Sequence, residues 1–112
     1  MSLTQEYQLF VIQLSGALDL HNNKALSVQF ANLLPQPHHL WVIDLVNVDF
    51  IDSSGLSTLV NGLATLRQNG CRLVICNLQA PVRIIFELTR LDSVFEIFES
   101  YEAFLTTVNV RQ

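Results

Sequence analysis

The sequence predicts an α/β fold in which a mostly parallel sheet, of mixed type and with four or five strands, carries about four helices. Two observations lead to this fold class. Short runs of β-forming or apolar residues alternate along the chain with segments whose apolar residues recur at helical spacing. Half of the 112 residues are hydrophobic and 14% are charged, which suffices for the packed core of a single domain over residues 1–112.

The first strand and the first helix are predicted in the N-terminal third. Tyr7–Leu14 alternates loosely and is rich in β-forming residues, and Gly16 is expected to end this strand. Asn22 or Asn23 can cap the helix that follows. The Pro35–Pro37 segment is expected to stop that helix, because proline cannot continue a helical hydrogen-bond ladder.

The second strand and the second helix are the clearest elements of the chain. Leu40–Val46 is a continuous apolar run interrupted by Asp44, which indicates a strand covered on both faces. The helix begins near Ser53 or Ser54, and its apolar residues recur at i, i+3, i+4 and i+7. Gly70 is expected at the position just after the helix, where a left-handed backbone is common.

The last third repeats the alternation with shorter segments. Arg72–Asn77 predicts a third strand, and Pro81 fits the first turn of a third helix. Phe95–Phe98 is a short strand candidate, and Ser100 can cap a last helix. Strands and helices that alternate in this way favour a mostly parallel sheet.

Charge and hydropathy exclude several classes of function. The net charge is −4 and the six basic residues are scattered, so no clustered positive face is expected for nucleic acid. No apolar run approaches the ~20 residues of a membrane span. The first six residues lack the basic and apolar regions of a signal peptide. We expect a cytoplasmic protein without membrane or nucleic-acid partners, with Cys71 and Cys76 as buried thiols.

Polar residues gather where the predicted strands end. Asp19 follows the first strand, Asp44 lies in the second, Asp52–Ser54 follows it, and Asn77 ends the third. In open α/β sheets, functional groups collect beyond the carboxyl ends of the strands. Backbone N–H groups at the start of a helix lack partners and the helix dipole is positive there, so an anion is tolerated. A serine in that place can carry a phosphate without unfolding its helix.

Each of these residues also has a structural interpretation. Asp52–Ser54 can serve as a helix cap, Asp44 as an acceptor for a loop amide, Asp19 as a turn residue or cap, and Asn77 as a cap of the third helix. A cation site formed by the three aspartates is a further alternative. No cofactor is expected, because the four glycines are isolated and form no phosphate-binding loop.

An enzymatic function is not favoured by the histidines. A serine nucleophile needs a base within hydrogen-bond reach. His38 and His39 precede the second strand and therefore lie at its opposite end, which leaves His21 near the rim that carries the serines. The pattern around the serines is not the Gly-x-Ser-x-Gly elbow of hydrolases. A small hydrolase or a nucleotide-binding protein is kept as the less favoured alternative.

The residues at this rim carry a family resemblance. Ile43–Leu56 closely resembles the core motif of STAS domains, the module of sulfate transporters and anti-sigma factor antagonists. Gly16–Asp19 resembles the Gly-x-Leu-Asp of that family, and the similarity continues through Val74–Asn77 and Val82–Asp92. It covers almost the whole chain. It implies a sheet of four or five strands with helices packed on it, and no catalysis.

The resemblance also implies a phosphorylation switch. In anti-anti-sigma members, a partner anti-sigma factor with serine/threonine kinase activity phosphorylates the serine before the motif glycine, which is Ser54 here. The unphosphorylated form binds the anti-sigma factor and frees the sigma factor, and a PP2C-type phosphatase restores it. The alternative within the family is a scaffold whose serine is never phosphorylated. The expected partner-binding surface consists of Asp19, Asn22, Asn23, Asp52, Ser53, Ser54 and Gly55.

Three further expectations depend on this resemblance. Gly55 is expected to reject larger side chains, because they would crowd a docking kinase loop. Arg90 stands where the family commonly has glycine, and a positive φ there would cost arginine on the order of 1 kcal/mol. The first strand of the family is hard to find before Tyr7, which leaves the edge of the sheet open to question.

Overall fold

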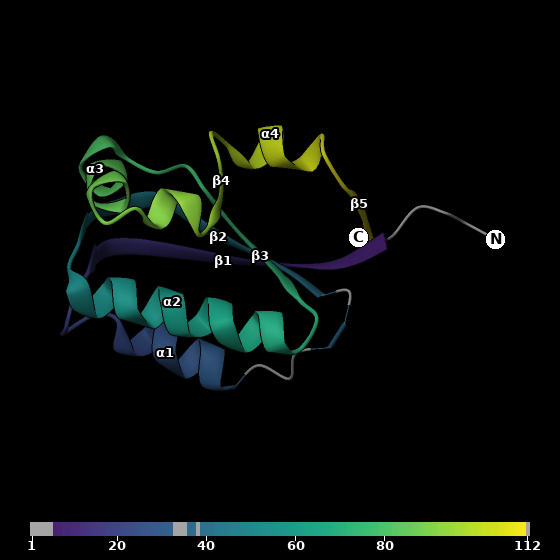
Figure 1. The fold of residues 1–112 in the computed structure, drawn as a ribbon, viewed down its shortest axis with the longest axis horizontal. Coiled ribbons are helices and arrows are strands. Elements are labelled where there is room, and N and C mark those ends of the chain that lie inside the picture. The colour runs from purple at the N-terminus through teal and green to yellow at the C-terminus, as the bar shows by residue number, and fades with distance from the viewer. Residues whose placement is uncertain (1–5, 33–35, 38, 112) are drawn as a thin grey trace.

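The computed structural model describes residues 6–32, 36–37 and 39–111 (Figure 1). The elements in chain order are β1 (Glu6–Leu18), α1 (Lys24–Ala31), β2 (His39–Ile51), α2 (Ser53–Gln68), β3 (Arg72–Cys76), α3 (Ala80–Leu88), the 3-10 turn η1 (Leu91–Ser93), β4 (Glu96–Phe98), α4 (Tyr101–Leu105) and β5 (Asn109–Arg111). Within these residues, no helix is long and apolar enough to cross a membrane.

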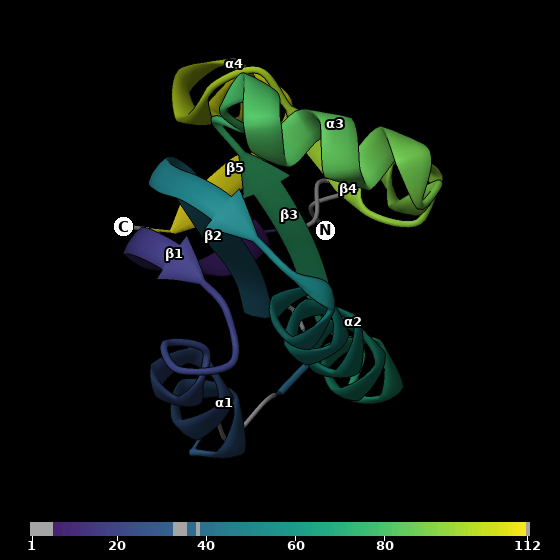
Figure 2. The same cartoon turned by 90° about the vertical axis from the view of Figure 1, so that its left-hand side faces the viewer.

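The strands form one sheet in the order β4-β3-β2-β1-β5, and every pairing between described strands is parallel. Helices α1 and α2 lie on one side of the sheet and α3 and α4 on the other, as both views show (Figures 1 and 2). The predicted α/β fold is therefore confirmed. The expected site lies where β1 and β2 end, which is the edge that faces the viewer in Figure 2.

The position of β2 in the middle of the sheet explains the apolar run Leu40–Val46, which Asp44 interrupts. Trp41, Ile43 and Leu45 belong to the larger core cluster, which also contains the buried leucines of α2. Leu40 and Val42 belong to a smaller cluster with Phe104 of α4. Because helices cover β2 on both faces, successive residues of this strand are buried in both directions.

Both β1 and β2 continue past their predicted ends through irregular steps in their pairing. We expected Gly16 to end β1, but it does not. Gly16 lies inside the strand with a φ of 83°, next to a shift of register. A second shift in register lies between Asp44 and Asn47 of β2, where the Val46 N–H donates to Oδ1 of Asp44 at 3.0 Å. The Val46 carbonyl accepts from Nε2 of Gln79 at 2.7 Å. Side chains thus form hydrogen bonds with the backbone N–H and carbonyl groups that have no partner in the neighbouring strand at this irregular step.

Helix α2 ends as the sequence predicts. Gly70 has a φ of 74°, and its N–H donates to the Arg67 carbonyl at 3.1 Å. The N–H of Cys71 donates to the Leu66 carbonyl at 2.9 Å, which completes a Schellman motif. Cys71 and Cys76 are both buried and free, as expected. Burial, with smaller contributions from two nearby carboxylates, raises the pKa of the Cys76 thiol to about 11, so this thiol stays protonated.

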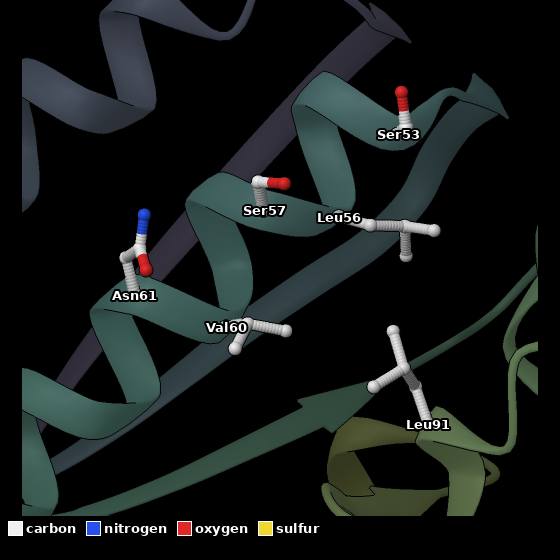
Figure 3. Close-up of a pocket in the computed structure, with 6 residues that line it drawn as sticks. All are labelled: Ser53, Leu56, Ser57, Val60, Asn61 and Leu91. Carbon is white, nitrogen blue, oxygen red and sulfur yellow. The ribbon is translucent and has the colours of Figure 1, made fainter.

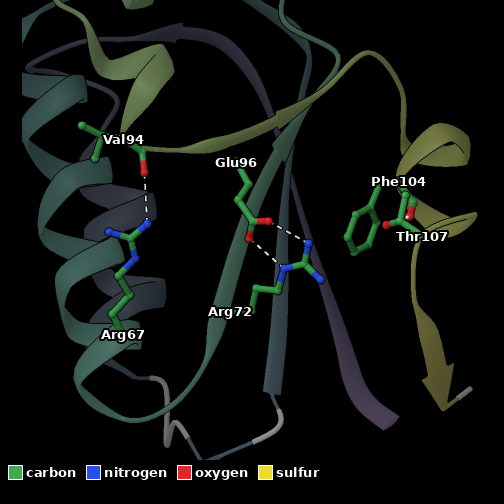
Figure 4. Close-up of polar contacts among 6 residues, drawn as sticks. All are labelled: Arg67, Arg72, Val94, Glu96, Phe104 and Thr107. Carbon is green, nitrogen blue, oxygen red and sulfur yellow. Dashed lines mark hydrogen bonds and ion pairs between the residues drawn. The ribbon is translucent and has the colours of Figure 1, made fainter. Parts of the chain in front are cut away.

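Two arginines connect the β4 region to α2 and β3 through hydrogen bonds (Figure 4). Arg72 of β3 makes a bidentate pair with Glu96 of β4, with both N–O distances at 2.7 Å. Arg67 of α2 donates to the carbonyl of Val94, just before β4, at 3.0 Å. These contacts hold a strand of three residues at the end of the sheet.

Several local predictions need correction. β5 was not predicted, and Asn109–Arg111 pairs with the first residues of β1. The cap position of α3 is Gln79 rather than Asn77, whose side chain instead donates to Asp44. Ser100 caps α4 through the Ala103 N–H, as predicted. Pro35 and the segment before β1 lie outside the described residues, so the predicted helix stop and the missing first strand are not addressed.

Arg90 has a φ of 61°, so the residue that follows the end of α3 adopts the left-handed conformation that favours glycine. A left-handed backbone costs an L-residue roughly 1–2 kcal/mol, and the Arg90 side chain is exposed. We predict that Arg90→Gly raises the free energy of unfolding by about 1 kcal/mol, measured by urea denaturation.

The matched control is Glu87→Gly, an exposed position inside the same helix. Glycine there should lower the free energy of unfolding by about 1 kcal/mol. If both variants are destabilised, the left-handed conformation of Arg90 costs nothing and the interpretation is wrong.

Candidate functional site

The candidate site forms where the loop from β1 to α1 meets the first turn of α2. β2 ends at Ile51 and α2 begins at Ser53, so Asp52 alone connects them. Asp52 has an extended backbone, and its Oδ1 accepts from the Gly55 N–H at 2.9 Å. It is therefore the cap of α2, and Ser53 and Ser54 are the first two helical residues.

Asp52 also ties the helix to the neighbouring strand. Its Oδ2 accepts from the N–H of Leu20 at 3.3 Å, and its own N–H donates to the Leu18 carbonyl at 3.2 Å. Each carboxylate oxygen thus accepts a backbone N–H from a different segment. These contacts give Asp52 a positioning role within the chain, and its expected place on the partner-binding surface stays a prediction.

Asp19 organises the turn that leads into α1. Its Oδ1 accepts from the N–H groups of His21 and Asn22 at 3.1 and 3.0 Å. Its carbonyl accepts from the N–H groups of Asn22 and Asn23 at 3.1 and 2.8 Å. Asp19 is therefore the turn residue that one of the sequence interpretations describes. It is half-buried, so part of its carboxylate still faces solvent beside the site.

Asn23 and Ser54 meet although 31 positions separate them in the chain. Nδ2 of Asn23 donates to Oγ of Ser54 at 2.6 Å and to Oγ1 of Thr58 at 3.1 Å. The Thr58 hydroxyl donates to the Ser54 carbonyl at 3.1 Å. Ser54 therefore faces α1, whereas Ser53 is exposed. Thr58 was missed from the sequence, although its i+4 spacing from Ser54 places both on one face of α2.

Gly55 is buried, and a Cβ added there would collide with the carbonyl oxygen of Leu18. The same atom would lie 2.9 Å from Cγ of Leu18 and 3.0 Å from Cγ1 of Ile51. Gly55 thus lets α2 approach the end of β1 closely. We still expect Gly55 to reject larger side chains. The physical cause is packing against Leu18 and Ile51 inside the chain, and not contact with a docking kinase loop.

The aspartates of the rim are engaged in separate contacts. Asp44 Oδ1 accepts from Nδ2 of Asn77 at 3.1 Å, in addition to the N–H of Val46. Asp19 and Asp52 bind backbone N–H groups, as described above. In the described part of the chain, no group of three His, Cys, Asp or Glu side chains comes together that could hold a metal ion. The rim therefore gives no support to the alternative of a cation site.

A shallow cavity of about 380 Å³ opens on the other side of the first turns of α2 (Figure 3). Ser53, Ser57 and Asn61 follow one another at i+4 spacing along its helical wall. Figure 3 also shows the apolar side chains of Val60 and Leu91 at the cavity. Sequence reasoning missed this surface, although the polar stripe on α2 could have indicated it.

Comparison with known proteins agrees with the fold. The family model of the STAS domain matches residues 1–104. An anti-sigma F factor antagonist of Paenibacillus polymyxa is 27% identical over 104 residues, which cover 91% of this chain and 88% of that protein. A putative anti-sigma factor antagonist, BtrV, of Bordetella bronchiseptica is 30% identical over 95 residues, which cover 85% and 82%.

A solved structure of the anti-sigma factor antagonist SpoIIAA in its unphosphorylated form shares the fold, with a TM-score of 0.64 and 17% identity over 96% of this chain and 92% of that chain. The family model covers residues 1–104, and with them β1 to β4 and the Asp52–Gly55 turn at the start of α2. The chain therefore belongs to the STAS domain family, and the relatives that it resembles are anti-sigma factor antagonists.

Proposed function

We propose that this chain is a phosphorylation-switched anti-sigma factor antagonist and that Ser54 is its phosphorylation site. The unphosphorylated chain binds an anti-sigma factor with serine/threonine kinase activity and so releases a sigma factor. In the transfer, Oγ of Ser54 bonds to the γ-phosphorus of ATP, ADP leaves, and the hydroxyl proton passes to a base of the kinase. A PP2C-type phosphatase removes the phosphate. Such partners place the protein in the cytoplasm.

The observation that carries this proposal is the place of Ser54 in the second position of a helix of 16 residues. The first backbone N–H groups of a helix have no acceptor within the helix, and the helix dipole is positive there. Asp52 occupies the N–H of Gly55, which leaves the N–H groups of Ser53 and Ser54 near the added phosphate. The helix therefore tolerates a phosphate on Ser54.

Electrostatics supplies the reason for release of the partner. A phosphate adds about 1.5–2 negative charges at neutral pH, and the chain already carries −4. Asp19 and Asp52 contribute carboxylates at the same rim. A partner that covers this rim would have to desolvate the dianion, which is costly without a paired cation. We therefore expect phosphorylation to weaken binding while the fold stays intact.

The contacts of Ser54 support a binding function rather than catalysis. A serine nucleophile is activated by a base that accepts its proton. The neighbour of Ser54 Oγ is the Nδ2 group of Asn23, which is a donor and cannot accept that proton. This arrangement favours a chain that is a substrate of its partner over a hydrolase that uses Ser54.

We predict that Ser54→Ala folds, gains no phosphate from the cognate kinase and ATP, and binds the anti-sigma factor permanently. The fold should persist because the helix cap is Asp52 and not Ser54. Intact mass spectrometry measures the phosphate, and isothermal titration measures the binding. Ser53→Ala is the matched control, and it should still acquire one phosphate.

Two results would contradict the assignment. Phosphate on Ser54→Ala but not on Ser53→Ala would move the acceptor to Ser53. A wild-type chain that binds the kinase tightly yet never acquires phosphate would be a constitutive scaffold.

Asp19 allows its structural and its recognition roles to be separated. Asp19→Ala removes the acceptor of two turn N–H groups and should lower the free energy of unfolding by about 0.5–2 kcal/mol. Asp19→Asn keeps a side-chain oxygen but removes the charge, so its stability should change by about 0.5 kcal/mol or less. We predict that Asp19→Asn nevertheless slows phosphorylation of Ser54.

The measurement pairs a thermal melt with a phosphorylation rate on the same preparation. A wild-type rate in a folded Asp19→Asn protein would restrict Asp19 to the turn and remove it from the partner surface.

A further inference from the structure

Asn23 occupies the position that caps α1, but its side chain does not cap that helix. Asparagine is among the residues most favoured at such positions, because its side chain usually accepts an N–H from the first turn. Here the backbone of Asn23 is helical, with φ −73° and ψ −7°, and the carboxamide points to α2 instead. The Asn23 side chain therefore does not cap α1 and instead connects the start of α1 with the start of α2.

The contacts of Thr58 fix the orientation of the Asn23 carboxamide. The Thr58 hydroxyl donates its only proton to the Ser54 carbonyl, so it can act toward Asn23 solely as an acceptor. The NH2 group of Asn23 must then face Thr58 and Ser54, and its two protons reach the two hydroxyl oxygens at 3.1 and 2.6 Å. The bond to Ser54 uses an oxygen lone pair and not the hydroxyl proton.

We propose that Asn23 is a positioning residue that holds the Ser54 side chain before phosphorylation and donates to the phosphate afterwards. This inference rests on the proposed function, since it takes Ser54 as the acceptor. Before phosphorylation, the bond from Nδ2 fixes the direction of Oγ. After phosphorylation, the same donor lies next to the phosphate, whose non-bridging oxygens are strong charged acceptors.

The phosphate arrives on a side of Oγ that Nδ2 does not occupy, because the phosphorus replaces the hydroxyl proton while Asn23 donates to a lone pair. With 2.6 Å between Nδ2 and Oγ, no phosphorus atom fits between these two atoms. Nδ2 therefore stays beside Oγ, within reach of the non-bridging oxygens that are bonded to the same phosphorus atom.

The test uses a chain with phosphoserine incorporated at position 54 during translation, so that no kinase is needed. The second pKa of the phosphate is measured by ³¹P NMR titration. A donor stabilises the dianion and lowers this pKa, so Asn23→Ala should raise it by about 0.5 units, a roughly threefold change in proton affinity. Asn23→Asp should raise it further, because a carboxylate of equal size replaces the donor.

Asn22→Ala is the matched control. Asn22 is the exposed neighbour of Asn23 in the same turn, and its N–H donates to Asp19. Its replacement should leave the phosphate pKa unchanged. Asp52 and Lys24, the charged residues adjacent to Ser53 and to Asn23, are identical in all of these variants. If Asn23→Ala does not fold, the phosphate pKa is compared in Asn23→Asp alone, since aspartate is equally favoured at a helix start.

A second readout concerns the unphosphorylated chain. The side-chain NH2 signals of Asn23 in a ¹H–¹⁵N spectrum should shift in Ser54→Ala and stay in place in Ser53→Ala. An unchanged phosphate pKa in the folded Asn23 variants, or an equal shift in Asn22→Ala, would overturn the inference. Neither measurement involves a kinase, so their failure is distinct from a failure of Ser54 to be phosphorylated by a partner.

Discussion

The close approach of α2 to the end of β1 is the constraint on which the site depends. Gly55 makes this approach possible, because the Leu18 carbonyl occupies the space that a side chain would need. Asp52 then joins the two segments, with one carboxylate oxygen on the Gly55 N–H and the other on the Leu20 N–H. The turn that leads to α1 is held in the same way by Asp19. As a result, Asn23 and Ser54 meet at 2.6 Å.

This construction suits a switch that changes a surface and leaves the fold alone. The helix that carries Ser54 is anchored by six buried residues, from Gly55 to Leu66, and by the Asp52 cap. A phosphate at its second residue meets a favourable dipole and no core side chain. In the proposed switch, its charge acts on the partner and on the contact with Asn23, while the free energy of unfolding is expected to change little.

The sequence predicted what periodicity and local chemistry can encode. The alternation of strands and helices, the left-handed Gly70 and the Ser100 cap follow from neighbours in the chain. The left-handed conformation of Arg90 was anticipated from the family resemblance. The sequence did not predict contacts between distant segments. The bond between Asn23 and Ser54 and the role of Gly55 against Leu18 join positions more than 30 residues apart. The register shift between Asp44 and Asn47 of β2 was missed because it depends on how β2 pairs with β1.

The comparison of Gly55→Ala with Gly62→Ala tests the central constraint most directly. Alanine normally stabilises a helix interior by about 0.5–1 kcal/mol relative to glycine. At Gly62 the added Cβ would lie 2.5 Å from the ring of Phe30, a half-buried side chain that can rotate away. At Gly55 it would meet the Leu18 carbonyl, which the sheet holds. Urea denaturation should show that Gly55→Ala lowers the free energy of unfolding by about 1–3 kcal/mol, and by more than Gly62→Ala. A Gly55→Ala protein more stable than the wild type would contradict the account.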